Sequence, residues 1–117
     1  MIIVRNKKTY KGPGFYIGRP SVLGNPYSCK EKSLAKYRVK SDKDAVSNFR
    51  EYATIQYIVN EEFKNAIEEI IQHSQTHKET NLICWCSPND CHGDVIKEYV
   101  EKELLKRSNS AELKWKI

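Results

Sequence analysis

Two consecutive helical segments that lie between strand-like segments restrict the fold more than any other feature of this chain. Apolar residues recur at helical spacing up to Val59 and again over about Glu61–His73. Ser41 or Asp42 can cap the first helix, and Asn60 can end that helix or cap the second one. Helices inserted between strands in this order predict an α/β fold.

Strand-like segments precede and follow the two helices. Met1–Arg5 and Gly14–Gly18 are rich in β-branched or aromatic residues, which favours strands. Asn81–Cys86 is short, apolar and bounded by turn residues, as is typical of a buried strand. The end of the chain, Leu113–Ile117, alternates apolar and charged residues and predicts an edge strand after a linker at Ser108–Ser110.

A third helix should begin at Cys91 or His92, directly after the turn that follows the buried strand. The 117 residues suit one domain and are too few for two. We therefore predict a single α/β domain over residues 1–117. We expect a small Rossmann-like open sheet of about four strands with three helices, and parallel pairing across the long crossovers.

Charge and composition narrow the class of partner. The net charge of +5 favours an anionic partner, such as a nucleotide, a phosphorylated metabolite or a nucleic acid. Lysine and glutamate are interspersed over Glu98–Arg107 and form no single basic block, so the lysines could instead only keep a small protein soluble. Nucleic acid is therefore a possible partner but not the favoured one. No segment approaches the roughly 20 apolar residues that cross a bilayer. With no recognisable signal peptide, we expect a cytoplasmic protein without a membrane partner.

Two loops each follow a predicted strand and are expected to meet. They are Gly18–Pro26, which is rich in turn-forming residues, and Cys84–Asp94, which holds three of the four cysteines. Ligands of open α/β sheets bind beyond the carboxyl ends of the strands. The sequence therefore predicts a ligand site at the junction of these two loops.

The Cys84–Asp94 segment has two interpretations. Zinc could bind Cys84, Cys86, Cys91 and His92, but adjacent ligands at positions 91 and 92 fit one tetrahedral centre poorly. Alternatively, the start of the third helix faces the ligand, and backbone N–H groups of Cys91, His92 and Gly93 hold a phosphate. We prefer the second interpretation, with no metal and no cofactor, and with Cys84 and Cys86 packing as small apolar residues.

The same segment supplies the candidate catalytic residues. His92 could act as acid or base or donate a hydrogen bond. Asp94 could also act as acid or base, orient His92 or bind a ribose hydroxyl. Gly93 would let a ligand approach the backbone closely. Cys91 is a possible nucleophile because a helix start lowers the pKa of a thiol.

The Gly18–Pro26 loop supplies groups that suit a nucleotide. Arg19 offers a planar fork for a phosphate or carboxylate, and Ser21 and Asn25 offer neutral hydrogen bonds. Gly18 allows a tight turn, and Tyr16 or Tyr27 could stack on a base. The alternative is a rigid surface loop without a ligand.

Two motifs carry a resemblance to a known family. They are G-R-P-S-x-L-G-N-P over Gly18–Pro26 and C-W-C-x-P-x-x-C-H-G-D over Cys84–Asp94. In both motifs, and in the helices between them, the chain resembles the domain of unknown function 4326 family. The resemblance implies a bacterial or phage origin and carries no established activity.

The expected function is binding of a nucleotide-like, phosphate-bearing ligand, with possible processing of a nucleotide or nucleoside. A non-catalytic protein that senses or sequesters a nucleotide signal is the first alternative. A zinc-stabilised interaction module is the second. An edge strand near Trp115 could pair with a second copy of the chain to form a homo-oligomer.

Overall fold

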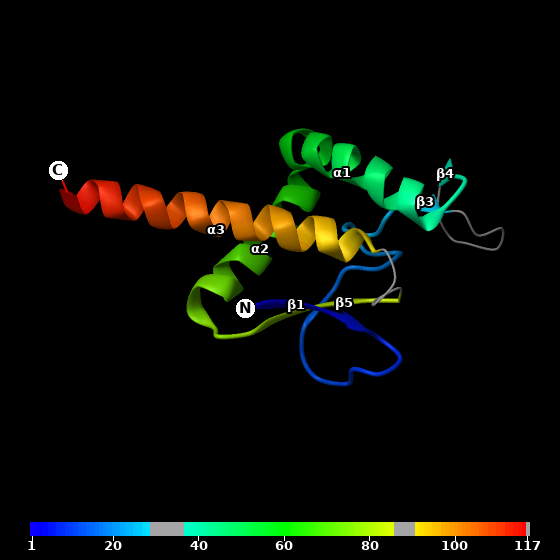
Figure 1. The fold of residues 1–117 in the computed structure, drawn as a ribbon, viewed down its shortest axis with the longest axis horizontal. Helices are drawn as coiled ribbons and strands as arrows, with labels where there is room; N and C mark the ends of the chain where they lie inside the picture. Colours follow the sequence, from blue (N-terminus) through cyan, green and yellow to red (C-terminus); the bar gives the residue numbers. More distant parts are fainter. Residues whose placement is uncertain (29–36, 86–90, 117) are drawn as a thin grey trace.

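The computed structural model describes residues 1–28, 37–85 and 91–116, with side chains described as far as Ser108. Its main sheet has three parallel strands in the order β1-β5-β2. The strands are β1 (Ile2–Asn6), β5 (Thr80–Cys84) and β2 (Phe15–Tyr16). The first strand of the chain therefore lies beside the last one, and the expected parallel pairing is confirmed (Figure 1).

A second, smaller sheet lies apart from the first. It contains β3 (Tyr27–Ser28) and β4 (Tyr37–Arg38), which pair in parallel. We expected about four strands in one sheet, whereas the described strands form a sheet of three and a sheet of two. The mixed α/β class and the three helices agree with the prediction.

The first two helices begin and end close to where the sequence places them. They are α1 (Asp42–Val59) and α2 (Glu61–Thr76). The Ser41 hydroxyl caps α1 by accepting a hydrogen bond from the Asp44 N–H. Asn60 serves both helices, because its backbone N–H donates to Gln56 and its side-chain oxygen accepts from the Phe63 N–H. Both predicted roles of Asn60 are thus confirmed.

Helix α3 (His92–Lys116) is longer than the sequence indicates, and the predicted edge strand over Leu113–Ile117 is wrong. The start near His92 is as predicted, but the helix continues through the expected linker at Ser108–Ser110. No glycine or proline follows Gly93, so nothing in the sequence breaks the helix. Serine and asparagine cost only about 0.5 kcal/mol each in a helix.

The helices lie on one side of the β1–β5 pair, and the loop over residues 7–14 lies on the other side (Figure 1). Residues alternate between these two faces of the sheet. Ile2, Leu82 and Cys84 face the helices and are almost fully buried in the core. The core is completed by apolar residues of the helices, chiefly Phe49, Phe63, Ile67, Ile70, Ile71, Val95, Ile96 and Val100.

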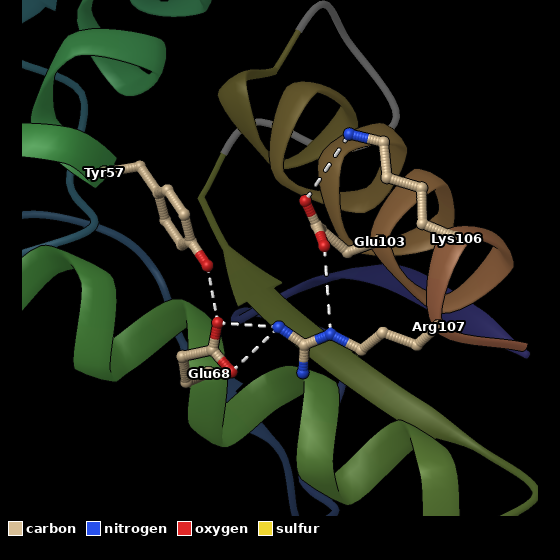
Figure 2. A network of polar contacts seen from close by, with 5 residues as sticks. All are labelled: Tyr57, Glu68, Glu103, Lys106 and Arg107. Carbon is tan, nitrogen blue, oxygen red and sulfur yellow. Dashed lines mark hydrogen bonds and ion pairs between the residues drawn. The ribbon is translucent and has the colours of Figure 1, made fainter. Parts of the chain in front are cut away.

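A polar network joins the three helices (Figure 2). The Tyr57 hydroxyl of α1 donates to Glu68 of α2, and the Arg107 guanidinium of α3 donates to both oxygens of the same carboxylate. Arg107 also lies 3.8 Å from Glu103. Burial and the Glu68 carboxylate together raise the pKa of Tyr57 to about 12. This network stabilises the packing of the helices.

Candidate functional site

The start of α3 lies against the end of β2, so the two predicted loops meet. The contact is a hydrogen bond from His92 Nε2 to the backbone oxygen of Ile17, at 2.7 Å. Ile17 immediately precedes the Gly18–Pro26 loop, and His92 is the first residue of α3. The described parts of both loops therefore share one edge of the sheet.

The His92 ring is buried, with 5% of the residue exposed. Its edge packs against Phe49, with ring centroids 5.0 Å apart. Burial lowers the pKa of His92, although the hydrogen bond to Ile17 opposes this shift. The ring is therefore neutral at pH 7 and carries its proton on Nε2, since the Ile17 oxygen can only accept. In this geometry His92 fixes the start of α3 to the sheet, and its acid–base role stays a prediction.

Cys91 caps the start of α3. Its Sγ accepts a hydrogen bond from the Gly93 N–H at 3.3 Å, and its backbone oxygen accepts from the Asp94 N–H at 3.1 Å. The Gly93 N–H, which we expected to hold a phosphate, is thus already bonded within the chain. A side chain at Gly93 would put its Cβ 2.9 Å from Val4 and 3.0 Å from Ile17. The glycine is required by close packing of α3 on the sheet.

Cys84 and Cys91 lie together beneath this helix start. Both are buried free thiols with their sulfur atoms 3.1 Å apart, and His92 Nδ1 is 3.8 Å from Cys91 Sγ. The packing role predicted for Cys84 agrees with this burial. Cys86, the third predicted zinc ligand, lies outside the described residues. Within residues 1–28, 37–85 and 91–116, no group of three or more His, Cys, Asp or Glu side chains is arranged to hold a metal ion.

The Gly18–Pro26 loop is held in shape by its own polar groups. Arg19 Nη1 donates to the Asn25 backbone oxygen at 2.6 Å, and the Tyr16 hydroxyl donates to the Arg19 backbone oxygen at 2.5 Å. The Asn25 side chain donates to Ala45 of α1 and accepts from the Tyr27 N–H. Both ends of the Asn25 amide are therefore occupied, which gives this residue a structural role in fixing the loop to α1.

Ser21 differs from its neighbours in this loop. Its hydroxyl oxygen is buried, yet it has no hydrogen-bond partner among the residues that the structure describes. The backbone around it is satisfied, since the Ser21 N–H donates to Gly18 and its carbonyl accepts from Gly24. A buried polar group without a partner costs about 1–3 kcal/mol, so its presence requires an explanation.

Sequence reasoning missed two residues at this edge, Lys7 and Trp85. Each directly follows a strand of the main sheet, β1 or β5. The Trp85 side chain is 51% exposed and donates its indole N–H to the Tyr16 hydroxyl at 3.0 Å. The Lys7 ammonium lies 4.6 Å from the centroid of the Tyr16 ring. Their position just beyond the carboxyl ends of strands was the signal that could have identified them.

The other predicted stacking residue, Tyr27, is used for packing. Its ring lies 5.2 Å from that of Tyr37 and 6.3 Å from that of Tyr52, between the small sheet and α1. Asp94 is exposed on the first turn of α3. His92 and Asn25 are thus polar residues of the site whose hydrogen bonds hold its parts together. The other polar residues of the site are the candidates for contact with a ligand.

Comparison with known proteins places the chain in a family. The family described as Domain of unknown function (DUF4326) matches residues 2–102. The chain belongs to this family. The match spans every strand of the DUF4326 domain and the start of α3, and so includes both loops of the candidate site. No curated protein and no solved structure matches the chain. Within the described residues, none of the helices combines the length and apolar content that crossing a membrane requires.

Proposed function

We propose that this domain binds a small nucleotide-like ligand, which bears a phosphate, between the Gly18–Pro26 loop and the start of α3. The observation that carries the proposal is the buried Ser21 hydroxyl, which has no partner among the described residues. A ligand oxygen would supply the missing hydrogen bond and offset the cost of burying this group. The location agrees with ligand binding at the carboxyl edge of small Rossmann-like parallel sheets.

Arg19 is the natural partner for the phosphate. One of its terminal nitrogens holds the Asn25 carbonyl, which orients the guanidinium while leaving other N–H groups to donate. Arg19 lies two residues from Ser21 in the same loop. The Arg19 guanidinium would thus bind the phosphate of the proposed ligand.

The geometry favours a binding protein over an acid–base enzyme. His92 is buried, neutral and committed to the Ile17 carbonyl, so protonating or moving its ring would disturb the start of α3. Asp94, the other predicted catalytic residue, is exposed on the first turn of α3. We therefore propose a sensor or sequestering protein, with nucleotide processing through Asp94 as the alternative.

The test titrates the protein with AMP, ADP or inorganic phosphate and measures binding by calorimetry. Thermal unfolding with and without each compound measures the change in unfolding temperature. Ser21→Ala should leave the free protein as stable or raise its free energy of unfolding by about 1 kcal/mol, because an unsatisfied hydroxyl is removed. The same variant should weaken binding of the nucleotide about tenfold. Ser47→Ala, at an exposed serine on α1, is the matched control. It should leave nucleotide binding unchanged and raise the free energy of unfolding by no more than the difference of about 0.5 kcal/mol in helix propensity.

Two outcomes contradict the proposal. One is that none of the three probes binds or raises the unfolding temperature. The other is that Ser21→Ala destabilises the free protein, since the hydroxyl would then have a partner within the chain. Long incubation with the bound nucleotide, followed by chromatography, separates binding from processing. Product formation that disappears in Asp94→Asn would establish the enzymatic alternative.

A further inference from the structure

The face of the main sheet that the helices do not cover carries cationic and aromatic side chains. Arg5, Ile83 and Tyr16 lie side by side across the three strands, since Arg5 pairs with Ile83 and Ile83 pairs with Tyr16. Lys7 lies two residues after Arg5, and Trp85 lies two residues after Ile83. Because successive side chains alternate between the two faces of a sheet, Lys7 and Trp85 lie on the same face as Arg5 and Ile83. We name this surface, together with the adjoining loop over residues 7–14, the outer face.

The outer face is rich in positive charge. Residues 1–28 contain five cationic side chains and no carboxylate, whereas the remaining residues contain fifteen cations and fifteen carboxylates. The segment that forms β1, β2 and their loops therefore carries a net charge of +5. Four of its five cations, Arg5, Lys7, Lys8 and Lys11, lie in β1 or in the loop that follows it.

Aromatic rings are interleaved with these cations. Trp85 is 51% exposed, and its ring and that of Tyr16 lie within 5.7 Å and 4.6 Å of the Lys7 ammonium. The Arg5 guanidinium lies 4.8 Å from the centroid of the Tyr10 ring. The Trp85 indole is held in place by its hydrogen bond to the Tyr16 hydroxyl. About half of Trp85 is thus exposed while its ring is held in one orientation.

Surfaces with this composition suit single-stranded nucleic acid. Lysines contact the phosphate backbone, and unpaired bases stack on exposed aromatic rings. Bases within a duplex are stacked on one another and cannot use such a ring. Glu79 lies 3.7 Å from Arg5 and partly neutralises the charge of this guanidinium. The lysines of the loop leave a net positive surface beside the rings.

We propose that the outer face binds single-stranded DNA or RNA, with a base stacked on Trp85 and phosphates contacted by Lys7, Lys8 and Lys11. The ammonium of Lys7, which now lies over the rings, would move to a phosphate when a base stacks. Lys7 is exposed and flexible, so this movement is inexpensive. The proposal does not depend on the ligand site at Ser21 and Arg19.

The experiment measures binding of fluorescein-labelled oligothymidylate and oligouridylate of about 15 nucleotides by fluorescence anisotropy. Stacking on tryptophan contributes about 1–3 kcal/mol per base, so Trp85→Ala should weaken binding about 5- to 150-fold. Trp85→Phe should retain most of the affinity because a ring remains. Fluorescence of Trp85, read in a Trp115→Phe background, should be quenched as the oligonucleotide binds.

Charge variants test the contribution of the lysines. Lys7→Gln and Lys8→Gln should each reduce the slope of log K against log salt concentration by about 1. Lys102→Gln removes the same charge from the exposed surface of α3 and is the matched control. The control should lower the affinity and the slope much less than either loop variant.

The proposal is overturned if neither oligonucleotide binds, or if Trp85→Ala binds as tightly as the unchanged protein while its circular dichroism stays native. Equal effects of Lys102→Gln and Lys7→Gln would also overturn it, because they would indicate attraction by net charge alone. It fails as well if a duplex of the same length binds as tightly, or if a vesicle of anionic lipid competes fully. Ser21→Ala should leave oligonucleotide binding unchanged, which separates this surface from the small-ligand site.

Discussion

The buried ring of His92 makes the stability of the fold depend on pH in a range where carboxylates do not titrate. The pKa of His92 is lowered from its ordinary value of 6.5, chiefly because the ring is removed from solvent. As the pH falls below 6.5, the unfolded chain binds a proton at this position while the folded chain does not. Stability is therefore fully present above pH 6.5 and is lost as the pH falls toward the lower folded-state pKa.

The size of the effect follows from proton linkage. One group that protonates only in the unfolded chain lowers the free energy of unfolding by up to about 1.4 kcal/mol between about pH 7.5 and about pH 5.5. His92→Gln keeps a donor that can reach the Ile17 carbonyl but cannot titrate. Over the same interval this variant should lose less stability than the unchanged protein, by up to about 1.4 kcal/mol.

Urea unfolding followed by circular dichroism at several pH values provides the measurement. The other two histidines, His73 and His77, are present in both proteins, so their contributions cancel in the difference between the two pH profiles. Parallel profiles for the two proteins would refute the argument. They would mean that the folded protein binds the proton as readily as the unfolded chain, and that the ring is not held in its neutral form.

Three further substitutions test other contacts. Gly93→Ala should lower the free energy of unfolding by about 1–3 kcal/mol, because the new methyl group would lie 2.9 Å from Val4; thermal unfolding measures this loss. Asn25→Ala should cost about 2–3 kcal/mol by removing the bonds to Ala45 and Tyr27, and a loss below about 0.5 kcal/mol would show that the amide is dispensable. Tyr57→Phe should lower the free energy of unfolding by about 1 kcal/mol, because the hydrogen bond to Glu68 is lost. In an ultraviolet titration of the folded variant, the phenol with a pKa of about 12 should be missing.

The helix caps and the approximate positions of helices and strands were predicted correctly where a few neighbouring residues determine the structure. Ser41 and Asn60 cap helices because their short polar side chains can reach backbone N–H groups, and this property is visible in the residues themselves. A helix start at Cys91 or His92 and a buried strand over Asn81–Cys86 were predicted on the same basis, and the structure begins α3 at His92 and places β5 over Thr80–Cys84. These features depend on a few neighbouring residues.

Two features differ from the predictions because the pattern of neighbouring residues did not determine the structure. The alternation of Leu113–Ile117 predicted a strand, but no signal ended the preceding helix, so α3 continued. Asn25 was predicted to contact a ligand, whereas its amide bonds to Ala45, twenty residues away in the chain. No local pattern reveals which of several polar residues in a loop will be used to fasten it.

The same limit applies to the chemistry of the candidate site. The sequence located the meeting point of the two loops, because both follow parallel strands. It gave His92 a role as acid, base or hydrogen-bond donor at the start of the third helix. The structure buries the ring against Phe49 and bonds it to Ile17. Burial of a single side chain depends on the whole core and is not encoded next to the residue.

The pairing of β1 with β5 has a consequence for the order in which the protein folds. Ile2 pairs with Thr80, so the sheet cannot form until about two thirds of the chain has been synthesised. Chains grow at about 5–20 residues per second, which leaves β1 without its neighbour for several seconds. The α1–α2 hairpin, joined by the single residue Asn60, depends on contacts close in sequence and can form during this delay. It would then shorten the loop that the two strands must close.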